Sequence, residues 1–213
     1  MNPGSVFDRL LDGGADRFVV RAADGAVWSM PIGRWLAPAS AVDERVLDRA
    51  AGPVLDVGCG PGRHVHALGR RGTVAVGVEL SPAAVRHART GGARVVEGSI
   101  FDVAPDPGCW ATALLLDGNI GIGGDPEALL RRVAGLLCPT GTILVELEPD
   151  AGAGPDTTSV CVRMEDADGL VSEWFPWSWV APDAIDAPAA AAGLRVAERW
   201  ADGGRHFCAL RPR

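Results

Sequence analysis

Three glycines spaced two residues apart, Gly58, Gly60 and Gly62, directly follow a short apolar run at residues 54–57. Glycines at the end of a buried strand let the backbone approach a ligand where any side chain would collide. Glu79 lies 21 residues after Gly58, the usual distance for an acidic side chain that accepts hydrogen bonds from a ribose. Together these features predict a site for a nucleoside-containing ligand.

The glycine spacing distinguishes between kinds of nucleoside. A dinucleotide-binding loop has a third glycine that allows a helix N-terminus to meet the pyrophosphate. Arg63 stands in that place here, and Asp56 inside the turn suits a cationic or amino-bearing ligand better than a pyrophosphate. These features disfavour an NAD(P)-dependent oxidoreductase, and so does the absence of any Tyr-Lys pair, but such an enzyme remains an alternative. A tight turn with only a structural role is the other alternative.

Asp117 and Asn119 follow an apolar run at residues 111–116. At the end of a strand they are candidate catalytic residues that orient a donor or an acceptor through hydrogen bonds. The alternative is turn chemistry, because nearby glycines suit a flexible loop without any substrate. With Asp125 they also offer oxygens to a magnesium ion, but isolated carboxylates near a loop are commonplace and we expect no metal.

His64, just after the glycine loop, is a candidate base near neutral pH. A surface or capping histidine is the more ordinary interpretation, and we favour it.

Tryptophans gather in one short segment, which contains Trp174 and Trp177. With Trp28 and Trp35 they would form an aromatic wall for an acceptor, since ligand pockets are mostly lined by such side chains. Packing between a hairpin and a sheet, or at a dimer surface, is the alternative.

Alternating apolar runs and amphipathic segments predict the elements that position these residues. Strands are expected at residues 54–57, 74–78, 94–96, 111–116, 142–147, 194–200 and 206–210, and helices near 42–50, 63–70, 82–90, 126–137 and 182–192. Strands that are apolar throughout and alternate with helices indicate a parallel sheet covered on both faces.

Two hairpins are expected outside this pattern. The first joins residues 18–21 to 26–30 through an Asp-Gly turn, and the second joins 159–164 to 170–174. We expect one domain over residues 1–213, with a lid at 1–50 and an inserted hairpin at 157–180.

Composition excludes several classes of protein. The chain has 213 residues, a formal net charge of -7, and neither Lys nor Tyr, which rules out a lysine Schiff base and a P-loop lysine. The acidic balance disfavours a nucleic-acid partner. Five scattered cysteines, no apolar leader and no membrane-length apolar run predict a cytoplasmic protein, either a monomer or a homodimer.

The glycine loop at residues 56–62 resembles the first motif of the class I S-adenosylmethionine-dependent methyltransferases. Residues 76–81, 96–102 and 114–119 resemble the three motifs that follow in that family, and residues 135–146 are similar to its next helix-turn-strand. The resemblance implies an α/β fold, a three-layer Rossmann-like sandwich around a seven-stranded, mostly parallel sheet of order 3-2-1-4-5-7-6.

The resemblance also implies a set of cofactor-binding residues for S-adenosyl-L-methionine and its product S-adenosyl-L-homocysteine. They are Asp56, Gly58, Cys59, Gly60, Gly62, Glu79, Leu80, Ser99, Ile100 and Asp117. The third motif usually carries an Asp for the adenine amino group where this chain has Ser99, which is a weaker acceptor. Three alternatives stay open: Ser99 makes this contact, Asp102 makes it instead, or the contact is lost.

We therefore expect a methyltransferase that acts on a small, partly apolar metabolite by direct in-line displacement. The acceptor would lie between the N-terminal lid and the second hairpin, with Trp28, Trp35, Asn119, Trp174 and Trp177 as its binding residues. A non-catalytic module that binds a cofactor or a partner is the alternative from another functional class.

Overall fold

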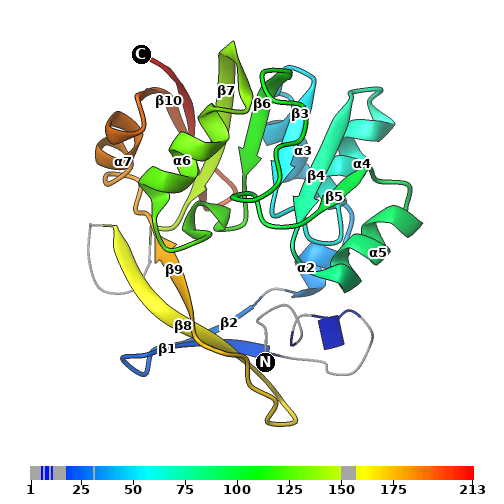
Figure 1. The fold of residues 1–213 in the computed structure, drawn as a ribbon, viewed down its shortest axis with the longest axis vertical. Coiled ribbons are helices and arrows are strands. Elements are labelled where there is room, and N and C mark those ends of the chain that lie inside the picture. Colours follow the sequence, from blue (N-terminus) through cyan, green and yellow to red (C-terminus); the bar gives the residue numbers. More distant parts are fainter. Residues whose placement is uncertain (1–5, 7, 10, 12–17, 31, 150–156) are drawn as a thin grey trace.

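The computed structural model describes residues 6, 8, 9, 11, 18–30, 32–149 and 157–213. These residues form a large seven-stranded sheet covered by helices and a separate four-stranded sheet beneath it (Figure 1).

The large sheet has the strand order that the family resemblance implies. In spatial order its strands are β5 (Val95–Glu97), β4 (Ala75–Glu79), β3 (Val54–Val57), β6 (Trp110–Leu115), β7 (Leu137–Leu147), β11 (Arg205–Pro212) and β10 (Leu194–Asp202). The first five are parallel, and β11 runs antiparallel to both of its neighbours. Numbered along the chain, this is the order 3-2-1-4-5-7-6, so the prediction is confirmed.

Helices cover both faces of the large sheet and give it three layers. These helices are α3 (Ala41–Leu47), α4 (Arg63–Arg70), α5 (Pro82–Thr90), α6 (Pro126–Ala134) and α7 (Asp186–Ala191), with a 3-10 turn η1 (Asn119–Gly121). The helix α2 (Ile32–Leu36) instead packs Ile32 and Trp35 on the small sheet. Side chains of α3, α4 and α5 pack in one core cluster, and those of α6 and α7 pack in the other. The apolar strands lie between these two clusters, as their sequence predicts.

Side-chain caps fix where the predicted helices begin. Ser40, Ser81 and Asp125 each accept a backbone N–H of the first turn. The helix expected over residues 126–137 ends at Ala134, because Leu137 pairs with β6 at the start of a long β7.

The small sheet contains both predicted hairpins. Its order is β2 (Val27–Ser29), β1 (Phe18–Ala22), β8 (Thr158–Asp166) and β9 (Phe175–Trp179), all antiparallel. The first hairpin is confirmed. The second strand of the other hairpin was wrongly placed at residues 170–174, since β9 follows that segment and includes Pro176. An edge strand tolerates a proline because one side of it needs no backbone donor.

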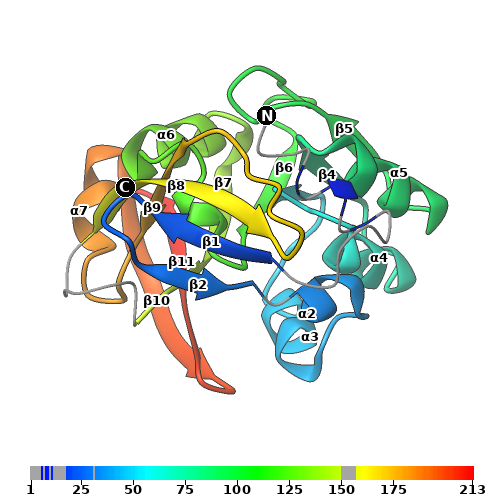
Figure 2. The ribbon, with the colours of Figure 1, turned by 90° about the horizontal axis from the view of Figure 1, so that it is seen from below.

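The small sheet lies across the carboxyl ends of the large sheet, and Figure 2 shows this arrangement from below. An antiparallel bridge joins Ile122, just after η1, to Trp177 of β9. A Cβ at Gly121 would lie 2.1 Å from the Ser178 carbonyl oxygen, so the two backbones approach closely there. The glycines after Asn119 thus serve close packing, in contrast to the flexible loop considered above.

Candidate functional site

The glycine loop (residues 58–62) leaves β3 in a backbone conformation that glycine favours. Gly58 has a φ of 71°, and a Cβ on it would lie 2.8 Å from the Asn119 Nδ2 atom. Gly60 has a φ of 53°, and a Cβ there would meet no atom within 4 Å. Gly60 therefore borders open space that a ligand can approach without a side chain in the way.

Glu79, the last residue of β4, faces this loop. Its carboxylate accepts hydrogen bonds from the backbone N–H groups of Gly60, at 2.9 Å, and Ser81, at 2.7 Å. Burial raises the pKa of Glu79, while these N–H groups oppose the rise. Each carboxylate oxygen keeps a lone pair for a further donor, such as a sugar hydroxyl.

A pocket of about 390 Å³ opens between the glycine loop and the small sheet. Eleven of the predicted residues line it: Trp35, Gly58, Cys59, Gly60, Glu79, Leu80, Ser99, Ile100, Asp117, Asn119 and Trp177. Sequence reasoning missed further apolar lining residues, among them Phe101, Ile122, Met164, Phe175 and Pro176. The pocket thus has a polar end at the loop and an aromatic end at the small sheet.

Two predicted tryptophans lie away from the pocket. Trp28 packs on Trp179, with ring centroids 4.5 Å apart, and Trp174 lies beneath the Arg163 guanidinium at 4.9 Å. Neither lines the pocket, so the structure does not place them in an acceptor wall. Trp28 lies on the edge strand β2, two strands away from the pocket-lining Met164 of β8, and Trp174 precedes β9.

Three other predicted cofactor residues also lie outside the lining. Gly62 caps α4 in a left-handed conformation with a φ of 87°, and Asp56 is buried beneath the loop. Asp102 is exposed and does not line the pocket, whereas Ser99 does. Ser99 therefore occupies the position at which the family resemblance implies an adenine contact.

Asn119 holds the glycine loop in place. Its Nδ2 donates to the carbonyl oxygens of Val57 and Gly58, at 2.8 and 2.9 Å. Because both N–H groups of this amide are engaged by the loop, the side chain of Asn119 serves to position the glycine loop.

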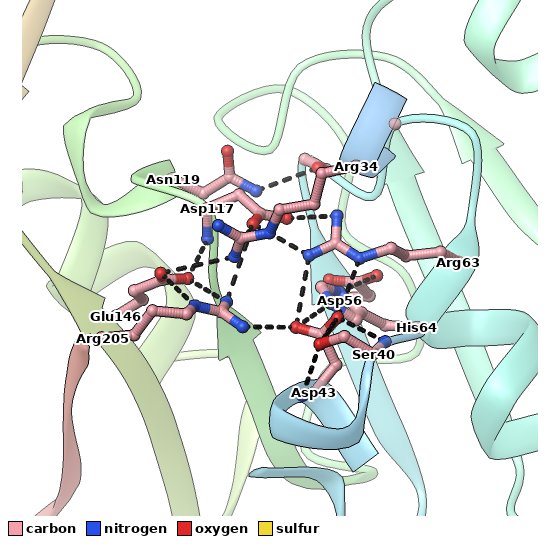
Figure 3. Close-up of polar contacts among 12 residues, drawn as sticks. Arg34, Ser40, Asp43, Asp56, Arg63, His64, Asp117, Asn119, Glu146 and Arg205 are labelled. Carbon is pink, nitrogen blue, oxygen red and sulfur yellow. Dashed lines mark hydrogen bonds and ion pairs between the residues drawn. The ribbon is translucent and has the colours of Figure 1, made fainter. Parts of the chain in front are cut away.

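Asp117 lies between two arginines from different elements (Figure 3). Its carboxylate is 2.7 Å from Arg34 of α2 and 2.6 Å from Arg63 of α4. Burial would raise the pKa of Asp117, but the hydrogen bond from Arg63 and the charges of His64, Arg63 and Arg34 lower it. A carboxylate held this way stays ionised and is a poor proton acceptor at neutral pH.

Arg205 extends the same network at the end of the chain (Figure 3). Both Nε and one terminal nitrogen bind Glu146 at 2.6 Å, and the other binds Asp43 at 2.7 Å. Glu146 also accepts the Asp117 backbone N–H at 2.7 Å. We call this set of residues the arginine–carboxylate network: Arg34, Asp43, Asp56, Arg63, His64, Asp117, Glu146 and Arg205.

His64 lies inside this network and is 4% exposed, so the favoured interpretation as a surface or capping residue was wrong. Its Nε2 and Nδ1 atoms are each 3.6 Å from a carboxylate, of Asp43 and Asp56 respectively. Burial alone would lower the pKa of His64, yet these two carboxylates raise it to about 9. His64 does not line the pocket, and its ring is charged at neutral pH.

No local spacing in the sequence points to the arginine–carboxylate network, because its members come from separate segments. The sequence singled out Asp56, Arg63, His64 and Asp117 one by one, each for another reason, and did not indicate that they pair with one another. Of the residues considered for magnesium, Asp117 is paired with arginines and Asp125 caps α6. Within the described residues, no cluster of His, Cys, Asp and Glu has a metal-binding arrangement, and no helix could cross a membrane.

Comparisons with known proteins agree with the predicted family resemblance. Residues 54–141 match the family model described as "Methyltransferase domain". A trans-aconitate 2-methyltransferase of Paracidovorax citrulli (strain AAC00-1) is 32% identical over 117 residues, which are 53% of this chain and 45% of that protein. The chain thus spans about half the length of this curated relative.

Solved structures share the fold. A SAM-dependent methyltransferase from Bacteroides fragilis, in complex with S-adenosyl-L-homocysteine, has a TM-score of 0.79 at 23% identity, covering 99% of this chain and 94% of that one. The CcbJ methyltransferase from Streptomyces caelestis has a TM-score of 0.64 at 20% identity, covering 84% and 92%. Streptomyces venezuelae DesVI has a TM-score of 0.61 at 23% identity, with the same coverage.

Proposed function

We propose that this protein, whose residues 54–141 match the methyltransferase-domain family model, transfers a methyl group from S-adenosyl-L-methionine to a small, partly apolar metabolite. The observation that carries the proposal is one pocket of about 390 Å³ with the glycine loop and Glu79 at one end and aromatic side chains at the other. Such a pocket suits a nucleoside-bearing donor beside an apolar acceptor.

The residues at the loop fit the cofactor. The open space beside Gly60 admits its amino-acid part, and the Glu79 carboxylate accepts from the ribose hydroxyls. Ser99 offers a hydroxyl to the adenine amino group, and Ile100, which is 3% exposed, packs beside the ring.

The bound cofactor would supply a methyl group on a sulfonium, which carries its own good leaving group. The chain's residues then have to align the acceptor and exclude water. Orientation alone contributes about 7–11 kcal/mol to such a step. Asp117 and His64, proposed above as catalytic, act through the network, since Asp117 is paired with two arginines and His64 lies outside the pocket. Both are positioning residues in this proposal, as is Asn119.

The acceptor end favours an uncharged molecule. Met164, Phe175 and Trp177 reach it from the small sheet, and Trp35 reaches it from α2. Arg63 is the one arginine among the described lining residues, and it is engaged by Asp43 and Asp117. A polycarboxylate such as trans-aconitate, in the name of the relative, would find no free cation there.

A thermal-shift experiment with S-adenosylhomocysteine and NADH in parallel tests the cofactor. A ligand at 100 times its dissociation constant adds about 2.7 kcal/mol, which raises the midpoint by several degrees in a domain of this size. We expect a shift with S-adenosylhomocysteine only, and its loss in Gly60→Val and Glu79→Ala. A shift with NADH alone would overturn the proposal.

The acceptor is tested next by a turnover screen with radiolabelled methyl donor. Neutral aromatic alcohols and amines are compared with di- and tricarboxylic acids. Turnover with the neutral set supports the proposed acceptor class, and turnover confined to the acids contradicts it. Cofactor binding without turnover of any acceptor would favour the non-catalytic alternative.

A further inference from the structure

A second, larger hollow lies beside the pocket described above, along the helices α4 and α5. Its volume is about 820 Å³, and it runs from α2 along α4 to the end of α5. We call it the basic groove, and its charged or titratable lining residues are Arg63, His66, Arg70, His87 and Arg94. No acidic residue is among its described lining residues.

The absence of acids contrasts with the rest of the chain. The whole sequence has 20 arginines against 27 acidic residues. Between Pro61 and Arg94 it has six arginines and one acidic residue, Glu79, which lines the other pocket. Positive charge is therefore concentrated on the segment that builds the groove, on a protein whose net charge is -7.

Three of these residues, Arg70, His87 and Arg94, are exposed and can reach a ligand. Neither Arg94 nor His87 pairs with a carboxylate of any described residue, and both are exposed. Arg70 is 58% exposed and lies 3.5 Å from Glu44. The positive charge of the groove also acts on His66. Burial and the charges of Arg70 and His87 lower the pKa of the His66 ring.

We propose that the basic groove binds a small molecule that carries a diphosphate group. Arginine guanidinium groups match phosphate oxygens with paired donors, and several phosphate oxygens are needed to engage groups on α4, on α5 and just before β5 together. The apolar end of the groove, at Trp35, Leu36 and Val74, accommodates the organic part. Trp35 and Arg63 line both the groove and the catalytic pocket, and they form the wall between the two.

An NMR titration of His66 with inorganic pyrophosphate tests this assignment. An anion in the groove offsets the charges of Arg70 and His87, so the pKa of His66 rises on binding. We expect saturable binding with this shift, and at least tenfold weaker binding in the double variant Arg70→Gln, Arg94→Gln. Arg195→Gln is the matched control, because it removes one exposed arginine from β10 at the opposite edge of the sheet.

Three results would overturn the proposal: no change in the pKa of His66, equal weakening in the Arg195→Gln control, or citrate binding as tightly as pyrophosphate at matched ionic strength. Tighter binding of single-stranded RNA than of any diphosphate would also overturn it, in favour of a macromolecular partner. Titrations with ADP and with an alkyl diphosphate distinguish a nucleoside from an alkyl chain as the organic part of the ligand. The compound whose organic part fits the apolar end of the groove should bind more tightly than pyrophosphate. The response to S-adenosylhomocysteine is independent of all these outcomes and tests the proposed function separately.

Discussion

Arg63, the first residue of α4, lies 2.6 Å from the carboxylate of Asp117, which follows β6. This ion pair ties the glycine-loop helix to the neighbouring strand end at the mouth of the pocket. Asp117 holds a left-handed backbone with a φ of 56°, uncommon for a residue other than glycine. The pair therefore fixes one wall of the pocket before any ligand arrives.

Arg205→Gln should lower the free energy of unfolding by about 3–5 kcal/mol, because it removes the shortest ion pairs of the buried carboxylates of Asp43 and Glu146 and leaves them only contacts of 3.4 Å or longer to other cations. Arg45→Gln removes a similar double contact, to Asp202, at a site where Arg45 is 53% exposed, and should cost less than about 1 kcal/mol. Urea unfolding of both variants measures the difference. Equal losses of unfolding free energy in the two variants would mean that burial does not determine how much these ion pairs contribute to stability.

The stability that His64 contributes should decline in alkaline solution. Its folded pKa, about 9, lies above its value of 6.5 in an unfolded chain. The contribution is therefore fully present below pH 6.5, amounts to about 3 kcal/mol, and is lost as the pH rises through 9. Urea unfolding of wild type and His64→Gln at pH 6, 7.5 and 9.5 measures it. A stability difference that stays constant with pH would contradict this account.

Gly121→Ala should destabilise the contact between the 3-10 turn η1 and strand β9 of the small sheet. The new Cβ would lie 2.1 Å from the Ser178 carbonyl oxygen and 2.6 Å from the Trp177 Nε1 atom, so we expect a loss of about 1–3 kcal/mol in stability. Gly69→Ala in α4 is the control, since its Cβ meets nothing within 4 Å and should stabilise the helix by about 0.5–1 kcal/mol. Urea unfolding followed by tryptophan fluorescence distinguishes the two. A neutral Gly121→Ala would show that the two backbones separate at little cost.

Binding of S-adenosylhomocysteine should weaken as the solution becomes acidic. Burial raises the pKa of Glu79, so its carboxylate takes up a proton above the ordinary value of 4.5 and loses capacity to accept ribose hydroxyls. Glu79→Gln should bind about ten- to hundredfold more weakly, the loss expected for hydrogen bonds to a charged group, and without this pH dependence. Calorimetric titrations from pH 8 to pH 5 compare the two. The same acid-side loss in Glu79→Gln would assign it to another group.

The large sheet could be predicted because its signals are local. An apolar run, a glycine loop and a capping serine such as Ser81 each specify an element within about ten residues of chain. The pocket residues at the strand ends, Gly60 and Glu79, follow from the same local order, since parallel strands place their carboxyl ends together.

The small sheet and the arginine–carboxylate network depend on pairing between distant segments. β9 contains Pro176, so its sequence is a weak strand signal, and its antiparallel register against β8 determines the pairing. Arg34 and Arg205 look like ordinary surface arginines until the fold brings them to Asp117 and Glu146. Nothing in their immediate neighbours indicates a buried ion pair.

The pairing of β1 with β8 has a consequence for folding during synthesis. Phe18 pairs with Asp166, and Ala22 with Val162, so the hairpin of β1 and β2 gains its central partner only after residues 162–166 have been synthesised. Contacts of such high sequence separation form late, because the entropy of closing the loop must be overcome first. The nascent hairpin meanwhile presents an unpaired strand edge and the apolar side chains of Phe18 and Val20, a combination that favours aggregation and that a chaperone would cover.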